Sequence, residues 1–328
     1  MLHGENMRAD KALTEHSEEM GYEHIHLNEK FNSVLKKGKG PGIKLNSELE
    51  NIKAFLFKSS DTYLMESTEE TFRLEIKTDP ESVRQQALWC GAKPGMRVLD
   101  VGCGPGKTTS ILYEMVQPGG SAVGIDLSLD RISHAKNHYC RQSGIDFTVC
   151  NLKEPLISIG QFDLIWVRFV LEYFREESYN IVRNLSEALK PGGYLCLLDL
   201  DYNCLSHHEL PPMIQDLLPK LMKRLEEECN FDAYAGRKLY SYLFDHGFNN
   251  IQVNLMAHHL FFGSIKETDF FNWMKKIEII VKRFEDLFTD YPGGCEAFID
   301  DFKKFLIDPR RFTYTPLILC KGMKPLDR

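Results

Sequence analysis

The residues best suited to chemistry stand where an apolar run ends in alternating glycines, at positions 98–106 (VLDVGCGPG). Glycine has no Cβ, so its backbone can turn sharply and lie directly against a ligand. A helix is predicted to begin directly after this loop. Its first turn would add free N–H groups and the positive end of the helix dipole. Strand, glycine loop and helix together predict a ligand cradle.

A single carboxylate, Asp126, stands where the next strand is expected to end, 20 residues after Gly106. At this spacing an acid at the tip of the second strand accepts hydrogen bonds from both hydroxyls of a ribose. Pro105 has no N–H to offer a pyrophosphate. Asp100 would repel a diphosphate but attract the ammonium group of an amino acid. The pattern therefore favours a zwitterionic, adenosine-bearing cofactor over a dinucleotide.

The elements that must position these residues follow from the hydrophobic pattern. Beyond Gly95 short apolar runs alternate with amphipathic stretches, which is typical of βαβ units and a parallel sheet. Ligands of such sheets bind outside the carboxyl ends of the strands, where the glycines and Asp126 fall. Predicted strands cover residues 97–101, 122–126, 147–151, 162–167 and 194–199, and predicted helices cover residues 80–91, 108–116, 130–142 and 172–189.

The rhythm changes after Asp201. A proline in the last predicted strand, Pro316, lacks the N–H of a ladder hydrogen bond, so it should lie near the strand's start or at a bulge. Aromatic residues at helical spacing between Phe261 and Phe284 are expected to form the core of a cap, with an apolar substrate pocket as the alternative. Predicted helices cover residues 211–229, 237–244 and 270–288, and predicted strands cover 247–256 and 313–321.

The glycine segment resembles the first motif of the class I S-adenosylmethionine (SAM)-dependent methyltransferases, and four further motifs follow in the family's order. The similarity covers roughly residues 72–201 and extends to the final strand. Residues 70–77 (ETFRLEIK) resemble a helix that precedes the core of many bacterial small-molecule methyltransferases. The four further motifs are Gly124–Ser128 (GIDLS), Cys150–Leu152 (CNL), Phe162–Trp166 (FDLIW) and Leu189–Gly193 (LKPGG).

This resemblance implies a role for each matching position. The glycines would approach the methionine part of SAM, Asp126 would hold the ribose, and Leu127 would pack on the adenine. Asn151 replaces the family's usual acid, and its amide can still pair with the adenine edge. Arg73 and Tyr63 would close over the cofactor. The implied cofactor-binding residues are Asp100, Gly102, Cys103, Gly104, Gly106, Asp126, Leu127, Asn151, Leu152, Val167, Arg168, Arg73 and Tyr63.

The resemblance requires no catalytic base, because a sulfonium methyl is already electrophilic and positioning alone can lower a barrier by ~7–11 kcal/mol. Arg168 is expected to bind a carboxylate of substrate or cofactor, or to form a salt bridge with Glu172. Asp199 and Asp201 follow the fifth strand, where they would orient or deprotonate an acceptor, or only cap loops. These three residues are the weak catalytic candidates, and no metal site is predicted.

Two histidine pairs, 207–208 and 258–259, could supply a base or metal ligands. Adjacent residues on a regular strand point to opposite faces, so at most one of each pair should face a given pocket. Structural or surface roles are therefore favoured for these histidines.

Composition narrows the partners. The 328 residues carry 40 Lys and Arg against 47 Asp and Glu, a formal charge of −7, which disfavours nucleic acid as a substrate. The chain lacks an apolar run of about 18 residues. The nine cysteines form no Cys-x-x-Cys pair, which favours reduced thiols over disulfides or zinc. We therefore expect a cytoplasmic protein that does not enter a membrane and acts on a small, partly apolar acceptor.

The predicted fold is a doubly wound, Rossmann-like α/β sheet of seven strands, the last antiparallel, with a helical N-terminal segment and a helical cap insertion. The predicted function is SAM-dependent methyl transfer to a small molecule. A SAM-binding sensor or scaffold, a methyltransferase acting on protein or nucleic acid, and a nicotinamide-dependent oxidoreductase are the alternatives. The predicted parts are a polar tail (1–45), a helical segment (46–92), a SAM-binding core (93–258), a cap (259–310) and a final strand (311–328).

Overall fold

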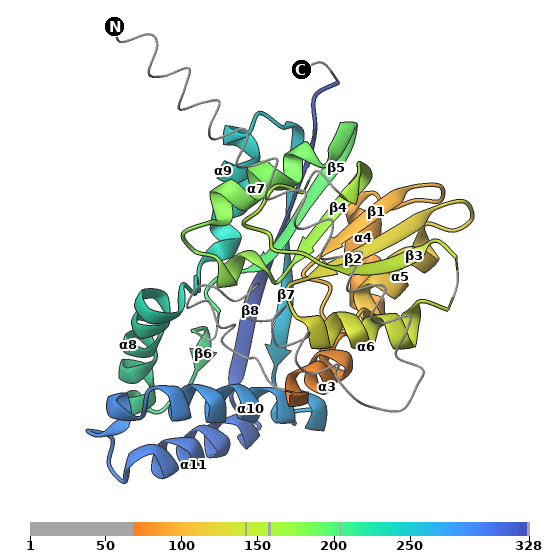
Figure 1. Cartoon of the computed structure of the whole chain (residues 1–328). Helices are drawn as coiled ribbons and strands as arrows, with labels where there is room; N and C mark the ends of the chain where they lie inside the picture. Colours follow the sequence, from red (N-terminus) through yellow and green to blue (C-terminus); the bar gives the residue numbers. More distant parts are fainter. Residues whose placement is uncertain (1–67, 142, 157–158, 204, 327–328) are drawn as a thin grey trace, which may run out of the picture. The chain divides into compact units, whose positions relative to one another are not determined.

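The structure is a computed structural model that describes residues 68–141, 143–156, 159–203 and 205–326. The chain divides into a large unit, residues 63–153 with 161–328, and a small one, residues 1–62 with 154–160. The large unit holds an α/β sheet with the helices that cover it (Figure 1). Of the predicted site residues, Tyr63 lies outside the described residues.

One sheet holds all the strands of the large unit's described part, in the order β3-β2-β1-β4-β5-β8-β6, with β7 paired to β8. Strands β1 to β5 are parallel, and β8 is antiparallel to β5 and β7. The predicted doubly wound arrangement with an antiparallel last strand is confirmed, and the two-residue β6 is an addition. The bounds are β1 Arg97–Val101, β2 Ser121–Asp126, β3 Ile145–Val149, β4 Phe162–Arg168, β5 Leu189–Leu200, β6 His207–His208, β7 Asn249–Phe261 and β8 Phe312–Met323.

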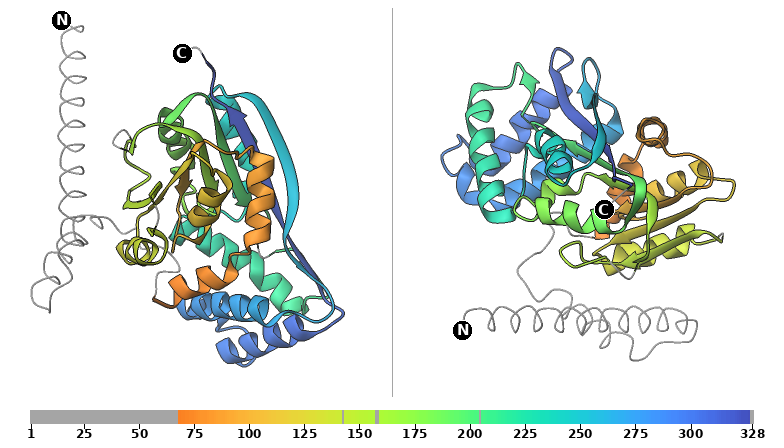
Figure 2. Two further views of the ribbon diagram at one scale, coloured as in Figure 1. Left: turned by 90° about the vertical axis from the view of Figure 1, so that its right-hand side faces the viewer. Right: turned by 90° about the horizontal axis from the view of Figure 1, so that it is seen from above.

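The central strands are buried on both faces, as a parallel sheet covered by helices requires. In β1, Val98, Leu99 and Val101 are at most 1% exposed. Figures 1 and 2 show α7 and α9 on one face of the sheet and α4 and α5 on the other. The helices on the sheet are α4 Pro80–Cys90, α5 Lys107–Met115, α6 Leu129–Tyr139, α7 Ser178–Glu187 and α9 Leu239–Asp245, the last preceded by the 3-10 turn η3 Ala235–Lys238.

Local sequence signals set the ends of α4 as predicted. Asp79 caps the helix by accepting a hydrogen bond from the backbone N of Ser82 at 3.0 Å, and Pro80 occupies the first turn. Gly91 ends the helix at φ +97°, a left-handed conformation that glycine adopts without strain. By contrast, the prediction of one helix over 172–189 is wrong. Residues 171–173 form a short 3-10 turn, η2, and α7 begins only at Ser178.

Three further helices bury a second apolar core. They are α8 Pro212–Cys229, α10 Glu267–Arg283 and α11 Gly294–Ile307, with the 3-10 turn η4 Glu285–Phe288 between the last two. The predicted aromatic core is present in part. Phe261, Trp273 and Phe284 are buried there, whereas Phe262 and Phe271, which were expected in the same core, are exposed. The N-terminal helix α3, Thr68–Lys77, packs against α10 (Figures 1 and 2). The 259–310 segment, which was predicted as a cap, therefore shares its core with α8, and β7 continues three residues past the predicted boundary at 258.

Pro316 lies inside β8, where its missing N–H disturbs the pairing with β7. Ala257 pairs with Pro316 and His259 pairs with Thr315, so His258 is an extra residue in a β-bulge. The bulge was expected in the last strand, but it falls on the partner strand opposite the proline. It breaks the alternation of β7, and the rings of His258 and His259 lie with centroids only 4.2 Å apart. The prediction that these two side chains point to opposite faces is therefore wrong.

No helix within the described ranges combines the length and apolar composition that crossing a membrane requires. Across these ranges, no three or more His, Cys, Asp or Glu side chains gather in a way that could hold a metal ion. The described cysteines are all free thiols.

Candidate active site

The loop between β1 and α5 is shaped by glycines that tolerate no side chain. Gly102 has φ +67°, and a Cβ there would lie 2.5 Å from Cγ2 of Val170. Gly106 has φ +100°, and its Cβ would lie 2.7 Å from that of Ala135. Cys103, which is buried, ties the loop to β2 by donating its backbone N–H to the carbonyl of Ile125 at 2.9 Å. The loop thus presents bare backbone at the carboxyl end of β1.

Helix α3 lies over this loop. A Cβ on Gly104 would meet Cδ1 of Leu74 at 3.5 Å, an ordinary contact distance. Lys107 Nζ donates to the carbonyl of Glu75 at 2.7 Å, and the Tyr139 hydroxyl donates to the Glu75 carboxylate at 3.0 Å. These contacts fix α3 against α5 and α6. The N-terminal helix therefore covers the glycine loop.

Asp126 ends β2 beside the loop, and its carboxylate already accepts two backbone hydrogen bonds. Gly104 N lies 2.9 Å from one oxygen, and Ser128 N lies 2.9 Å from the other. The guanidinium of Arg131 lies 3.6 Å away. A carboxylate offers about four lone-pair sites, so capacity for a diol remains. Asp126 is thus both a brace for the loop and an available acceptor.

Asp100 is buried at the end of β1 and accepts a hydrogen bond from the Thr109 hydroxyl at 2.6 Å. Burial raises the pKa of this carboxyl to about 7, although the Thr109 hydrogen bond and the nearby Arg168 lower it. The group therefore changes charge near neutral pH. A cation brought beside it would favour the ionised form.

The predicted adenine-side residues follow β2 and β3. Leu127 is half-buried, directly after Asp126. Asn151 uses its side-chain oxygen to accept the backbone N–H of Lys153 at 3.1 Å, which closes a turn. Leu152 is 7% exposed. The structure therefore places all three at the same edge of the sheet as the glycine loop.

At the end of β4, Val167 is buried and Arg168 turns toward α4. Arg168 Nε donates to Oε1 of Gln86 at 2.9 Å, and its guanidinium lies 4.1 Å from the ring centroid of Phe169. Burial lowers the pKa of Arg168 to about 10. Within the described residues Arg168 forms no ion pair with Glu172, so the salt-bridge alternative is wrong.

Phe169 is a centre of contacts that the sequence did not predict. Its φ of +58° is uncommon for a bulky residue and stores strain. The ammonium of Lys77 lies 4.9 Å from its ring centroid, and the His258 ring lies 4.6 Å away. Val170, the next residue, contacts Gly102 as described above. Phe169, which has a strained backbone and a cation against its ring, therefore lies next to the glycine loop.

Asp199 and Asp201 make contacts of a structural kind. Asp199 is 1% exposed and accepts the backbone N–H groups of Glu172 at 3.1 Å and Leu200 at 2.9 Å. Burial, with repulsion from Glu172, raises its pKa well above the usual range. Asp201 forms an ion pair with Arg237 at 2.9 Å. These contacts favour loop-fixing roles for both acids.

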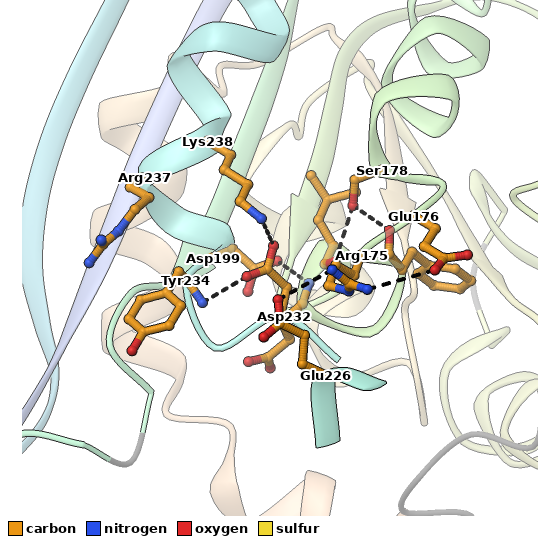
Figure 3. Close-up of polar contacts among 12 residues, drawn as sticks. Arg175, Glu176, Ser178, Asp199, Glu226, Asp232, Tyr234, Arg237 and Lys238 are labelled. Atoms are coloured by element: carbon orange, nitrogen blue, oxygen red, sulfur yellow. Dashed lines mark hydrogen bonds and ion pairs between the residues drawn. The ribbon is translucent and has the colours of Figure 1, made fainter. Parts of the chain in front are cut away.

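A polar network beside Asp199 holds the η2 turn in place (Figure 3). Asp232 receives the Tyr234 backbone N–H at 2.9 Å and an ion pair from Lys238. The Asp232 backbone N–H donates to the carbonyl of Glu172 at 2.7 Å, and Asn203 donates to the Glu172 carboxylate at 2.9 Å. The network therefore holds the buried Glu172 in place. The residues around Phe169 had separate sequence signals, because Arg168 and His258 were named as candidates and Lys77 lies in the 70–77 motif. Nothing in the sequence indicated that they meet at Phe169.

The comparisons with known proteins agree with this geometry. A family model described as a methyltransferase domain matches residues 92–248, which contain the glycine loop, Asp126 and Phe169. The chain contains a class I SAM-dependent methyltransferase domain. The resemblance drawn from the five sequence motifs is confirmed. In this methyltransferase domain the matched stretch begins at the end of α4 and runs through α9.

Individual relatives of the methyltransferase domain are distant. It is 29% identical over 137 residues to the ubiquinone/menaquinone biosynthesis C-methyltransferase UbiE of Vibrio vulnificus, covering 38% of this chain and 52% of the relative. It is 32% identical over 108 residues to the phosphoethanolamine N-methyltransferase of Triticum aestivum, covering 33% and 21%. The chain spans about a fifth to three fifths of the length of the curated relatives it matches.

A solved structure shares the fold of the methyltransferase domain. The crystal structure of a Bacillus halodurans protein described as a methyltransferase has a TM-score of 0.51 and 17% identity. The match covers 75% of this chain and 99% of the other. At this identity the likeness supports the architecture alone.

Proposed function

We propose that the protein transfers the methyl group of SAM to a small-molecule acceptor at the carboxyl edge of β1, β2 and β4. The observation that carries the proposal is the bare glycine loop with Asp126 beside it. Gly102 and Gly106 leave no room for a Cβ, so the loop requires glycine at both positions. This arrangement suits a ligand that lies against backbone while its sugar meets a carboxylate.

The residues present fit SAM position by position. The Asp126 carboxylate accepts hydrogen bonds from the backbone N–H groups of Gly104 and Ser128, and it still has lone pairs for the ribose hydroxyls. Asp100 would attract the ammonium group of the methionine part, and Leu127 with Leu152 would border the adenine. Asn151 keeps its amide N–H groups for the same ring, because its oxygen closes the turn to Lys153. Val167, Arg168, Arg73, Cys103 and Tyr63 remain predicted neighbours of the cofactor.

SAM supplies an electrophilic methyl group when bound, and the chain's own residues orient the acceptor and exclude water. Helix α3 covers the loop through Leu74 and Glu75, which shields the site from solvent. Orientation in a dry site can lower a barrier by ~7–11 kcal/mol, so no dedicated base is needed. The strained Phe169 and the groups around it would border the acceptor. The relatives named for ubiquinone, menaquinone and phosphoethanolamine methylation support a small acceptor.

Calorimetric titration with SAM and with S-adenosylhomocysteine, its demethylated product, tests the cofactor. Asp126→Ala should lower the affinity for SAM and for S-adenosylhomocysteine about 10–150-fold, because charge-assisted hydrogen bonds worth ~1.5–3 kcal/mol are lost. Asp130→Ala, an exposed acid in the first turn of α6, is the matched control and should leave affinity unchanged. If neither compound gives a heat of binding, the proposal is wrong.

Turnover separates an enzyme from a sensor. Incubation with SAM labelled in its methyl group and a panel of small phenols, amines and carboxylic acids should give a labelled product. SAM binding without transfer to any acceptor would favour the sensor instead.

A further inference from the structure

A row of rings and cations continues from Phe169 into the cap. The His258 ring lies between those of Phe169 and His259, tilted against both, with centroid distances of 4.6 and 4.2 Å. His259 in turn lies 5.4 Å from the Trp273 ring, and the Lys276 ammonium lies 5.9 Å from that ring. The row therefore joins β4, the bulge of β7 and α10. Each end of it carries an ammonium group, Lys77 at Phe169 and Lys276 at Trp273.

Positive charge is crowded along this row. The pKa of Lys77 falls well below its usual value through burial first, and then through repulsion from Lys276 and Arg73. Of the groups acting on Lys77, only Glu172 opposes this shift. Burial and the same lysines also hold the pKa of His258 and of His259 well below the usual range. Both imidazoles are therefore neutral at pH 7.

Neither lysine ammonium forms a hydrogen bond or a close ion pair with a residue that the structure describes. Both side chains are half-buried, and Glu172 is the acid that acts on both through its charge. A partly buried cation without a close partner is costly. The Nε2 atom of His258, buried between them, likewise has no hydrogen-bond partner among the described residues. The ammonium groups of Lys77 and Lys276 and the Nε2 atom of His258 can therefore each form a further hydrogen bond, and all three belong to the row that begins at Phe169.

We propose that the acceptor carries an anionic group, a carboxylate or a phosphate, that binds to Lys77, Lys276 and His258. This inference rests on the proposed function, because it assigns the row to the acceptor of the methyl transfer. An anion there would offset the repulsion between the lysines and accept hydrogen bonds from both ammonium groups.

The carboxylate of SAM is the competing occupant. Glu172 is the acid that acts on both Lys77 and Lys276. The row reaches Lys276 on α10, which packs in the second apolar core. An anion added to protein that already holds S-adenosylhomocysteine separates the two occupants, because the carboxylate of the cofactor product is then in place.

Inorganic phosphate and acetate are the probes, added at constant ionic strength to the full-length protein saturated with S-adenosylhomocysteine. We expect at least one of them to raise the Tm of the wild type, and the stronger probe indicates the class of anion. Lys276→Met and Lys77→Met should each lower the affinity for that anion at least tenfold, while the affinity for S-adenosylhomocysteine stays within threefold of the wild-type value. Lys276→Arg, which keeps the charge, should retain most of the effect.

Lys275→Met is the matched control, because Lys275 is the neighbour of Lys276 on α10 and faces Glu278 at 3.3 Å. It should respond to the anions as the wild type does. The inference is overturned if neither anion raises the Tm of the wild type, or if the anion raises the Tm of both methionine variants as much as that of the wild type. It is also overturned if the variants lose tenfold in affinity for S-adenosylhomocysteine. Failure of the proposed function shows separately, as wild-type protein that binds no S-adenosylhomocysteine at all.

Discussion

The site that we propose has a cofactor half and an acceptor half, and the two are built in different ways. The cofactor half is made from neighbours in sequence, because residues 100–106 form one loop and Asp126 ends the next strand. The acceptor half collects Lys77, Phe169, His258 and Lys276 from four distant elements. A local motif fixes the first half through backbone geometry, whereas packing of the cap and α3 fixes the second. Substitutions should therefore affect cofactor binding and acceptor handling separately.

The largest effect is expected at Gly102, in the cofactor half. Gly102→Ala places a Cβ 2.5 Å from Val170 Cγ2, at a φ of +67° that alanine disfavours. Backbone strain of ~1–3 kcal/mol and an overpacking cost of ~1–3 kcal/mol should lower the Tm. They should also lower the affinity for S-adenosylhomocysteine by about 100-fold or more. Thermal unfolding and calorimetry measure the two effects. Gly263→Ala, with φ +62° but open space around its Cβ, isolates the strain from the clash.

The next effect tests whether the acceptor half is independent of the cofactor half. Phe169→Ala removes the ring that contacts Lys77 and Arg168. Two cation–π contacts of ~0.5–1 kcal/mol each, the range for sites that are not fully desolvated, correspond to a loss of roughly 5–30-fold in methyl-transfer kcat/KM. S-adenosylhomocysteine affinity should stay within threefold, and Phe244→Ala, an exposed aromatic, should change neither. Equal losses in affinity and turnover would contradict the division.

How far the sequence predicted the site follows the same division. The loop, Asp126 and the ends of β1 and β2 were predictable, because strand, glycine and acid lie within 30 residues of one another. The role of Phe169 was not predictable, because the side chains at its ring come from β7 and α3, which are distant in sequence. Pro316 signalled a bulge, but which strand would bulge depends on pairing register, so the positions of His258 and His259 could not be predicted.

A smaller effect, on the pH dependence of SAM affinity, tests the role of Asp100. Burial raises its pKa to about 7 in the ligand-free fold, so the carboxyl is neutral below that pH and ionised above it. SAM affinity should be constant above about pH 8 and fall by up to tenfold per unit below about pH 6, since the ammonium loses its counter-charge. Asp100→Asn should bind more weakly at pH 8 and show a flatter profile. A wild-type profile that rises toward low pH would contradict this role.

The same shift makes a statement about folding. The raised pKa means that the folded protein holds its Asp100 proton to higher pH than the unfolded chain does. The unfolded state therefore loses the proton first, and this group destabilises the fold increasingly as pH rises from about 4 to about 7. Asp100→Asn should gain stability relative to wild type at pH 8 and not at pH 4, as measured by urea unfolding without ligand.

The smallest effect is expected at Asp201, and it separates strand-end acids that fix loops from groups that face the acceptor. Its ion pair with Arg237, whose side chain is about half exposed, is worth ~0–1 kcal/mol, because water screens such a pair. Asp201→Asn should therefore lower the free energy of unfolding by less than about 1 kcal/mol and leave kcat and KM unchanged. Arg237→Gln should match it, and a double variant should show the small coupling of an exposed pair. A tenfold fall in kcat from Asp201→Asn, with none from Arg237→Gln, would instead place this carboxylate in the acceptor half.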